Sequence, residues 1–211
     1  MPKAVDHEVR RAELLAATCR VIARDGIEGA TVRRISREAG YSTGVLTHYF
    51  QNKEDVLRTA LQAALHGDKS RIEARAAEAG GVRSLRNAAL AELPMDEERR
   101  HACEVRIGFW ARACADEGFA AEQRSRYFQL RRTFARLLDG ARDVGELRTD
   151  LDHEAEADRL IALCEGIAIQ ALFDSSRWTE TRLVGLVDAH LATLGIPSEP
   201  RQQRPKRTAV S

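Results

Sequence analysis

The chain has 211 residues, of which 44% are hydrophobic and 31% are charged, and its formal net charge at pH 7 is +1. This length allows one large domain or two small domains with a hydrophobic core. The low net charge excludes a polycationic protein, so any contact with a nucleic acid has to depend on local charge. No apolar run is long enough to span a bilayer, and the first ten residues lack the apolar region of a signal peptide, so we expect a cytoplasmic protein.

Apolar residues recur at helical spacing and no alternating strand pattern occurs, which predicts an all-α fold of about nine helices. The expected helices cover residues 6–25, 32–39, 44–50, 53–79, 82–93, 96–116, 119–142, 152–173 and 179–194. Gly26 suits the left-handed residue that follows a helix, Thr31 suits the cap that precedes one, and Gly40 ends the second helix. The domains predicted from this order are a helix-turn-helix domain over 1–52, a helical effector-binding and dimerisation domain over 53–196, and a disordered tail over 197–211.

The segment 31–53 has the layout of a helix-turn-helix, in which two short helices are joined by a tight turn. Gly44 would let the second helix approach the major groove of DNA, and Thr43, Thr47, His48 and Tyr49 would supply hydrogen-bonding groups. Basic side chains and Ser36 would face phosphates, which contributes salt-sensitive affinity. The predicted DNA-binding residues are Thr31, Arg33, Arg34, Ser42, Thr43, Gly44, Thr47, His48, Tyr49 and Lys53.

A short helix with these side chains can also be an ordinary exposed element, and the arginines a solvated face. The complete assembly favours the DNA-binding interpretation. Its parts follow one another in the order expected of such a domain: a cap, a short helix, a glycine turn, a second short helix and a lysine at the start of the next helix. The segment over about 9–57 resembles the N-terminal DNA-binding domain of the TetR family of bacterial repressors. The matching features are Asp25-Gly26, Thr31, A-G-Y-S-T-G-V-L at 39–46, Tyr49-Phe50 and N-K-E-D-V-L at 52–57.

The resemblance implies groove and adjacent phosphate contacts for Thr43, Thr47, His48 and Tyr49, and a contact with the DNA backbone for Lys53. Thr47 departs from the family pattern, since many members carry tyrosine at that position. This leaves the contacts at position 47 open.

The last two expected helices carry wide apolar stripes with small residues, which predicts a two-fold, four-helix dimer interface. The predicted interface residues are Leu160, Cys164, Ile167, Ala171, Leu183, Leu186, Val187 and Leu191. The alternative is that both helices belong to the core of a single chain. A dimer would place two heads in successive major grooves of a palindromic operator.

Aromatic residues concentrate in the helices expected over 96–116 and 119–142, where they form either a ligand cavity or plain core. The predicted cavity residues are Cys103, Arg106, Phe109, Trp110, Tyr127, Phe128 and Gln170. The body, with R-I-G-F-W at 106–110 and E-G-I-A-I-Q-A-L at 165–172, resembles the choline-responsive, BetI-like branch of the family. That resemblance does not identify choline as the effector, since related bodies respond to different molecules.

Four cysteines, Cys19, Cys103, Cys114 and Cys164, have spacings that fit neither a zinc site nor a dense disulfide framework. We expect reduced, buried thiols and neither a metal nor another cofactor. A nucleophile elbow, a glycine-rich phosphate loop and an H-E-x-x-H motif are also absent from the sequence, which disfavours an enzyme.

The sequence therefore predicts a ligand-responsive transcriptional regulator, a repressor, that binds operator DNA as a homodimer and is released by an unidentified small molecule. The helix that starts at Lys53 would transmit the change from body to head. The alternatives are a helical interaction protein that does not bind DNA and an all-α enzyme.

Overall fold

The computed structural model describes residues 2–195, with side chains from residue 7 onward, and the tail predicted over 197–211 lies outside the described residues. The described chain forms ten helices and no strands, which confirms the all-α prediction. The helices are α1 (Pro2–Gly29), α2 (Val32–Ala39), α3 (Thr43–Tyr49), α4 (Lys53–Ala77), α5 (Gly81–Ala91), α6 (Glu97–Gly108), α7 (Trp110–Ala113), α8 (Glu117–Asp143), α9 (His153–Phe173) and α10 (Glu180–Ala192).

Local signals in the sequence set the ends of the first helices. The Thr31 side chain accepts a hydrogen bond from the backbone N–H of Arg34, and Gly40 ends α2 in the left-handed conformation at φ 75°. The second predicted helix is therefore confirmed residue for residue. The first helix continues to Gly29 across a kink at Gly26, whose φ is 72°.

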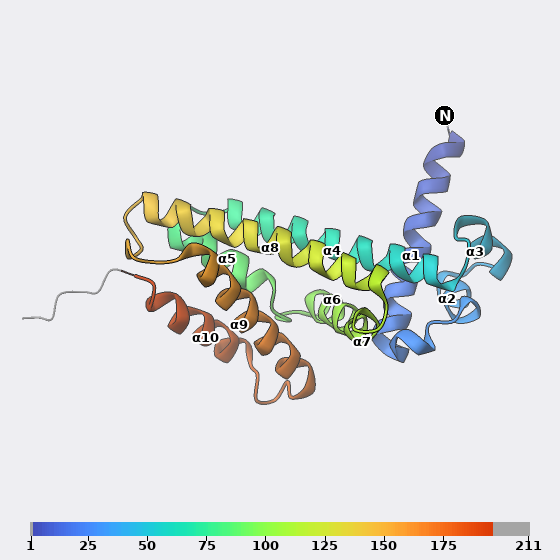
Figure 1. The fold of residues 1–211 in the computed structure, drawn as a ribbon. Helices are drawn as coiled ribbons and strands as arrows, with labels where there is room; N and C mark the ends of the chain where they lie inside the picture. Colours follow the sequence, from blue (N-terminus) through green and yellow to red (C-terminus); the bar gives the residue numbers. More distant parts are fainter. Residues whose placement is uncertain (1, 196–211) are drawn as a thin grey trace, which may run out of the picture.

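The molecule is elongated, with α1, α2 and α3 forming a head at one end and α9 and α10 lying near the other (Figure 1). The long helices α4 and α8 run along the body, and α4 connects the third helix of the head directly to it (Figure 1). Only residues 50–52 separate the end of α3 from the start of α4.

Two hydrophobic cores stabilise this arrangement. One occupies the body, and the other lies in the head but also takes in Val56 and Leu61 from α4, Val105 from α6, Phe109 and Phe119. The core of the head thus extends past residue 52, where the sequence suggested a domain boundary. Head and body share buried side chains at their junction.

The predicted sixth helix is two helices, because α6 ends at Gly108 and α7 starts at Trp110. Between them Phe109 is completely buried and its ring stacks on that of Phe119 at a centroid distance of 5.4 Å. Within the described part of the chain, no helix combines the length and the low polarity that crossing a bilayer requires.

Candidate functional site

The exposed edge of α3 is the first candidate site. The Ser42 side chain accepts a hydrogen bond from the backbone N–H of Val45 and so caps the helix, and Leu46 is fully buried beneath it. This anchoring leaves Thr43, Gly44, Thr47 and His48 exposed, while Tyr49 is half-buried. The structure therefore brings the predicted hydrogen-bonding residues together on one solvent-facing edge.

The hydroxyl groups on this edge differ in their existing partners. Thr47 Oγ1 donates to the backbone carbonyls of Thr43 and Gly44, at 3.2 and 3.1 Å, so its proton is used within its own helix. The Tyr49 hydroxyl has no hydrogen-bond partner among the described residues. Tyr49 consequently presents both a donor and an acceptor to an incoming ligand.

The start of α1 lies beside this edge, which the sequence did not indicate. The ring centroid of His7 is 4.4 Å from that of Tyr49, and the His48 ring meets the Tyr49 ring edge-on at 5.4 Å. A shallow groove separates the two helices and is lined by His7, Arg10, Ser42, Gly44, Val45, His48 and Tyr49. No local pattern connects His7 with residues more than forty positions away, so only the tertiary structure could identify it.

The predicted phosphate-facing residues have different environments. Arg33 is exposed and has no ion-pair partner among the described residues. Arg34 pairs with Asp25 at 3.2 Å, and Lys53 Nζ lies 3.9 Å from a Glu28 oxygen. Ser36 is buried, which corrects the expectation that it faces DNA.

Exposed ion pairs connect α2 to α1. Arg20 and Arg24 both contact the Glu38 carboxylate, at 2.9 and 3.0 Å. The hydrogen bond from Arg20, supported by Arg24, lowers the pKa of Glu38, and the hydrogen bond from Arg24 lowers that of Asp25. Exposed pairs of this kind contribute little stability individually, but they help to orient α2.

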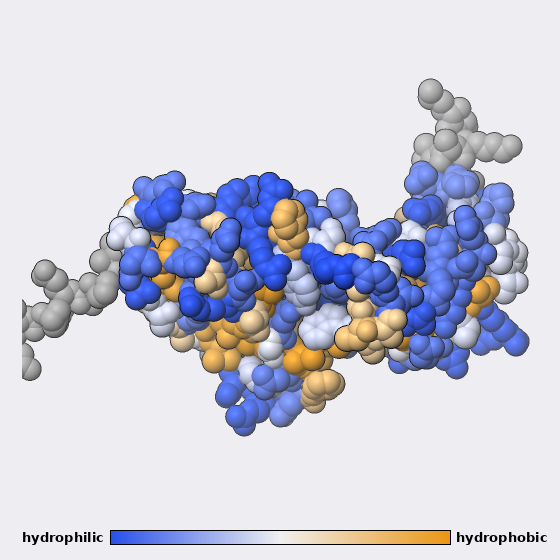
Figure 2. Space-filling view, in the orientation of Figure 1, coloured by the Kyte–Doolittle hydropathy of each residue, from blue (hydrophilic) through white to orange (hydrophobic). Residues whose placement is uncertain are grey.

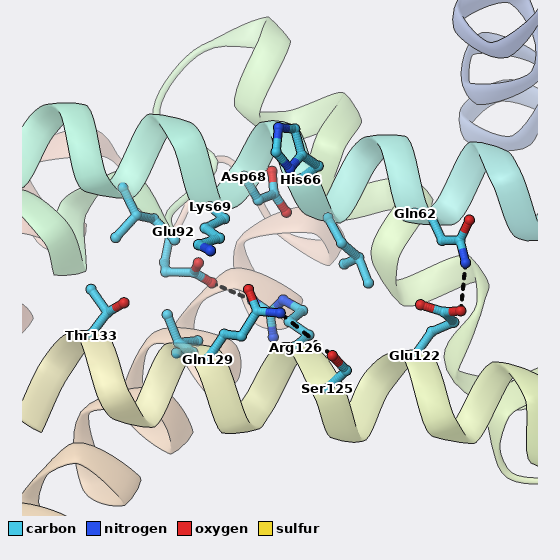
Figure 3. Close-up of a pocket in the computed structure, with 13 residues that line it drawn as sticks. Gln62, His66, Asp68, Lys69, Glu92, Glu122, Ser125, Arg126, Gln129 and Thr133 are labelled. Carbon is cyan, nitrogen blue, oxygen red and sulfur yellow. Dashed lines mark hydrogen bonds and ion pairs between the residues drawn. The ribbon is translucent and has the colours of Figure 1, made fainter.

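The second candidate site is a cavity of about 270 Å³ between α4 and α8 (Figure 3). Its lining residues are Gln62, Leu65, His66, Asp68, Lys69, Ile72, Glu92, Glu122, Ser125, Arg126, Gln129, Leu130 and Thr133. A hydrogen bond of 2.6 Å from Gln62 to Glu122 spans the two helices at one end (Figure 3). The lining combines aliphatic side chains and uncharged hydrogen-bonding groups with five charged residues, a mixture that suits a small polar organic molecule.

The buried charged residues Asp68, Glu92 and Arg126 form the floor of this cavity, and their partners lie behind it. Asp68 pairs with Arg106 at 2.9 Å, and Arg126 joins Glu92 at 2.6 Å to Glu165 at 2.8 Å. Burial by itself would lower the pKa of Arg106, but the nearby carboxylates of Glu92 and Asp68 outweigh burial and raise it. The guanidinium therefore stays charged, and the network connects α4, α6, α8 and α9.

None of the seven predicted cavity residues lines this cavity. Cys103 and Arg106 are buried, and Arg106 pairs with the floor residue Asp68. Phe109 belongs to the core of the head, and Phe128 is 60% exposed.

The other three predicted cavity residues also lie elsewhere. Tyr127 donates a hydrogen bond to Glu165, and burial, with help from that carboxylate, raises the pKa of Tyr127 to about 12. Trp110 is half-buried and Gln170 is exposed. Tyr127 and Phe128 lie on α8, as the cavity residues Arg126 and Gln129 do, but on parts of that helix that do not line the cavity.

The residues predicted to form the dimer interface are mostly buried within the single chain. Seven of the eight are buried inside the single chain, and these are Leu160, Cys164, Ile167, Ala171, Leu183, Val187 and Leu191. Leu186 is half-buried. The intrachain alternative therefore accounts for this face of the two helices.

The outward faces of α9 and α10 are also apolar. Ile169 and Val184 are only half-buried, and Phe173 is 82% exposed, while the half-buried Leu163 also packs against the core of the body. Figure 2 shows hydrophobic residues gathered over α9 and the adjoining part of α10. An exposed apolar surface of this kind is typical of a protein contact site.

The cysteines are only partly as expected. Cys103 and Cys164 are buried, and burial raises the pKa of both thiols, as it raises that of Cys19 to about 11. Cys114 is exposed, which corrects the expectation that every thiol is buried.

Comparison with known proteins identifies the two parts of the chain. Residues 14–60 match the family described as bacterial regulatory proteins of the tetR family, and residues 81–195 match the C-terminal domain of BetI-type transcriptional repressors. The HTH-type transcriptional regulator PksA of Bacillus subtilis is 31% identical over 97% of this chain and 98% of its own length. The regulator BetI of Escherichia coli is 27% identical over 94% of this chain and 100% of its own length.

Solved structures have the same fold. A transcriptional regulator from Rhodococcus sp. Rha1 is 27% identical and superimposes with a TM-score of 0.78 over 87% of this chain and 95% of its own. A regulator from Saccharomonospora viridis, solved in complex with choline, is 23% identical with a TM-score of 0.80 over 86% of this chain and 95% of its own. The chain is a helix-turn-helix transcriptional regulator. It belongs to the TetR family and carries a BetI-type C-terminal domain.

Proposed function

We propose that the protein acts in the cytoplasm as a homodimeric repressor that binds a palindromic operator through the exposed edge of α3. The observation that carries this proposal is the orientation of α3, whose Leu46 is buried while Thr43, Thr47 and His48 face solvent. A helix held in this way can enter a major groove without unfolding. Arg33 and Lys53 would contact phosphates on either side and supply the salt-sensitive part of the affinity.

The dimer contact is proposed on the outward faces of α9 and α10. Phe173, Leu163 and Ile169 offer apolar surface there, and a two-fold contact would use the same surface on both copies. Each copy would then hold its head at one end of the body, so that the separation of the two heads depends on the shape of both bodies.

The cavity between α4 and α8 is proposed as the effector site. Helix α4 connects Lys53, at the proposed DNA surface, with Asp68 on the floor of the cavity. A molecule that binds better when α4 and α8 are further apart would shift the dimer toward head positions that do not match the operator. The size of that shift is set by the difference in its affinity for the two states.

Choline is bound by the Saccharomonospora relative, but we propose a different effector for this chain. Proteins recognise quaternary ammonium groups with the faces of aromatic rings. The described lining of the cavity contains no phenylalanine, tyrosine or tryptophan. Its polar groups instead suit a molecule that forms hydrogen bonds with Gln129, Ser125 and Thr133.

The experiment is selection of genomic DNA fragments by the full-length protein, followed by fluorescence anisotropy on the enriched duplex. We expect a symmetric site bound with nanomolar affinity, at least a thousandfold more tightly than a scrambled duplex. Recovery of no preferred fragment would reject the operator proposal. Choline added to the complex should leave the anisotropy unchanged, and release by choline at submillimolar concentration would reject the effector proposal alone.

A further inference from the structure

The first turns of α1 run past α3 (Figure 1). His7 of α1 lines the same shallow groove as Gly44, His48 and Tyr49 of the α3 edge. His7 is exposed and its ring is 4.4 Å from the Tyr49 ring, with the two planes inclined at 42°. His48 approaches the same tyrosine from within α3 at 5.4 Å and 88°. Tyr49 therefore has an imidazole from α1 and another from its own helix against its ring.

We propose that His7 is a positioning residue for DNA binding, which fixes the Tyr49 ring so that its hydroxyl meets the DNA. This inference rests on the proposed operator contact of α3. It extends the DNA-binding surface to α1, outside the helix-turn-helix segment 31–53.

The chemistry of Tyr49 explains why a positioning residue is needed. Its hydroxyl is uncommitted among the described residues, and its ring is only half-buried, so the core of the head alone leaves one side of the ring without packing. Tilted and edge-on ring pairs are favourable and directional. A second ring at 4.4 Å restricts the rotation of the tyrosine side chain before DNA arrives, which lowers the entropy lost on binding.

The position of His7 is itself well determined. It lies on the long helix α1, whose later residues Leu14 and Val21 are fully buried in the core of the head. The His7 backbone is therefore held by the same core that buries Leu46 of α3. His7 and Tyr49 are thus placed relative to one another by packing, and not by a loop.

The test measures operator affinity of the full-length protein by anisotropy, with the duplex enriched by genomic selection. We expect His7→Ala to weaken binding about fivefold, the value of one aromatic pair, and His7→Phe to restore it to within about twofold. His101→Ala, an exposed histidine on α6, is the matched control and should bind like the wild type.

A double-mutant cycle shows whether His7 acts through Tyr49. His7→Ala should have no further effect in a Tyr49→Ala background, so the two losses should not add. Additive losses of affinity would overturn the proposal. So would a His7→Phe variant that binds as weakly as His7→Ala, or a His7→Ala variant that binds like the wild type. The thermal unfolding midpoint of His7→Ala should match that of the wild type. A large loss of stability in both His7→Ala and His7→Phe would likewise overturn the proposal. Failure of the wild type to select any duplex would instead reject the operator proposal.

Discussion

Two neighbouring arginines on α2 differ in whether they already form an ion pair within the protein. Arg34 is tied to Asp25, which also accepts hydrogen bonds from Arg24. Arg33 has no such partner among the described residues. Of these two arginines, Arg33 can contact a phosphate without first giving up an ion pair, so we expect it to contribute more to DNA affinity than Arg34.

Substitution of Arg33 by glutamine should lower affinity for specific and scrambled duplexes alike. One phosphate contact fewer reduces the slope of log affinity against log salt by about 0.9. Anisotropy titrations at several salt concentrations measure this slope. Arg75→Gln, in the last turn of α4 and paired with Glu78, is the control and should leave the slope unchanged. A normal slope for Arg33→Gln would show that this side chain does not contact the DNA backbone.

At the scale of secondary structure elements, Arg106 is the centre of the body. It joins α6 to Asp68 of α4 and lies near Glu92, which Arg126 of α8 also contacts. These side chains are almost completely buried, so each charge depends on its partners for compensation. Of these residues, Asp68, Glu92 and Arg126 line the proposed effector cavity, so a bound molecule would be in contact with the connection between α4 and α8.

Replacing Arg106 with alanine should cost about 3–5 kcal/mol of unfolding free energy, because it leaves buried carboxylates without their partner. Urea denaturation followed by circular dichroism measures the loss. The control is Arg131→Ala, which removes an exposed pair with Asp158 and should cost under about 1 kcal/mol. Equal losses for the two variants would mean that the buried network has no special role in stability.

At the scale of the whole molecule, α9 and α10 use one face for the core and leave the other face apolar and exposed. A charge at Ile167 or Leu191 would therefore disrupt folding and would not test dimer formation, since both are buried in the single chain. A test of dimer formation has to change the outward face, where Leu163, Ile169 and Phe173 lie.

Ile169→Glu should yield a folded monomer in sedimentation velocity and weaken operator binding, because two heads then no longer bind together. Val144→Glu is the matched control and should remain dimeric. Val144 is 64% exposed and caps the C-terminal end of α8, which lies far from the C-terminal end of α9 (Figure 1). A dimeric Ile169→Glu protein at micromolar concentration would exclude this face as the contact surface.

Local chemistry allowed much of the fold to be predicted. Thr31 and Gly40 act within four residues of their own positions, so the limits of α2 followed from the sequence alone. The exposed edge of α3 could also be predicted from the sequence, and in the structure Leu46 is buried while Thr43 and Thr47 are exposed. Gly26 has the expected left-handed conformation, although α1 continues beyond it to Gly29. The break at Phe109 was harder to predict, because the burial of Phe109 depends on Phe119, which the chain reaches only later.

By itself, the sequence determined that this protein is all-helical, that a helix-turn-helix stands at its N-terminus, and which family it belongs to. Only the tertiary structure decided which apolar faces are covered by the chain itself, where a cavity lies, and that His7 meets Tyr49. Helical periodicity reveals that one face of a helix is apolar, but Ile167 and Ile169 are both isoleucines of α9. Which of them is buried depends on contacts between distant segments, and no local pattern records these.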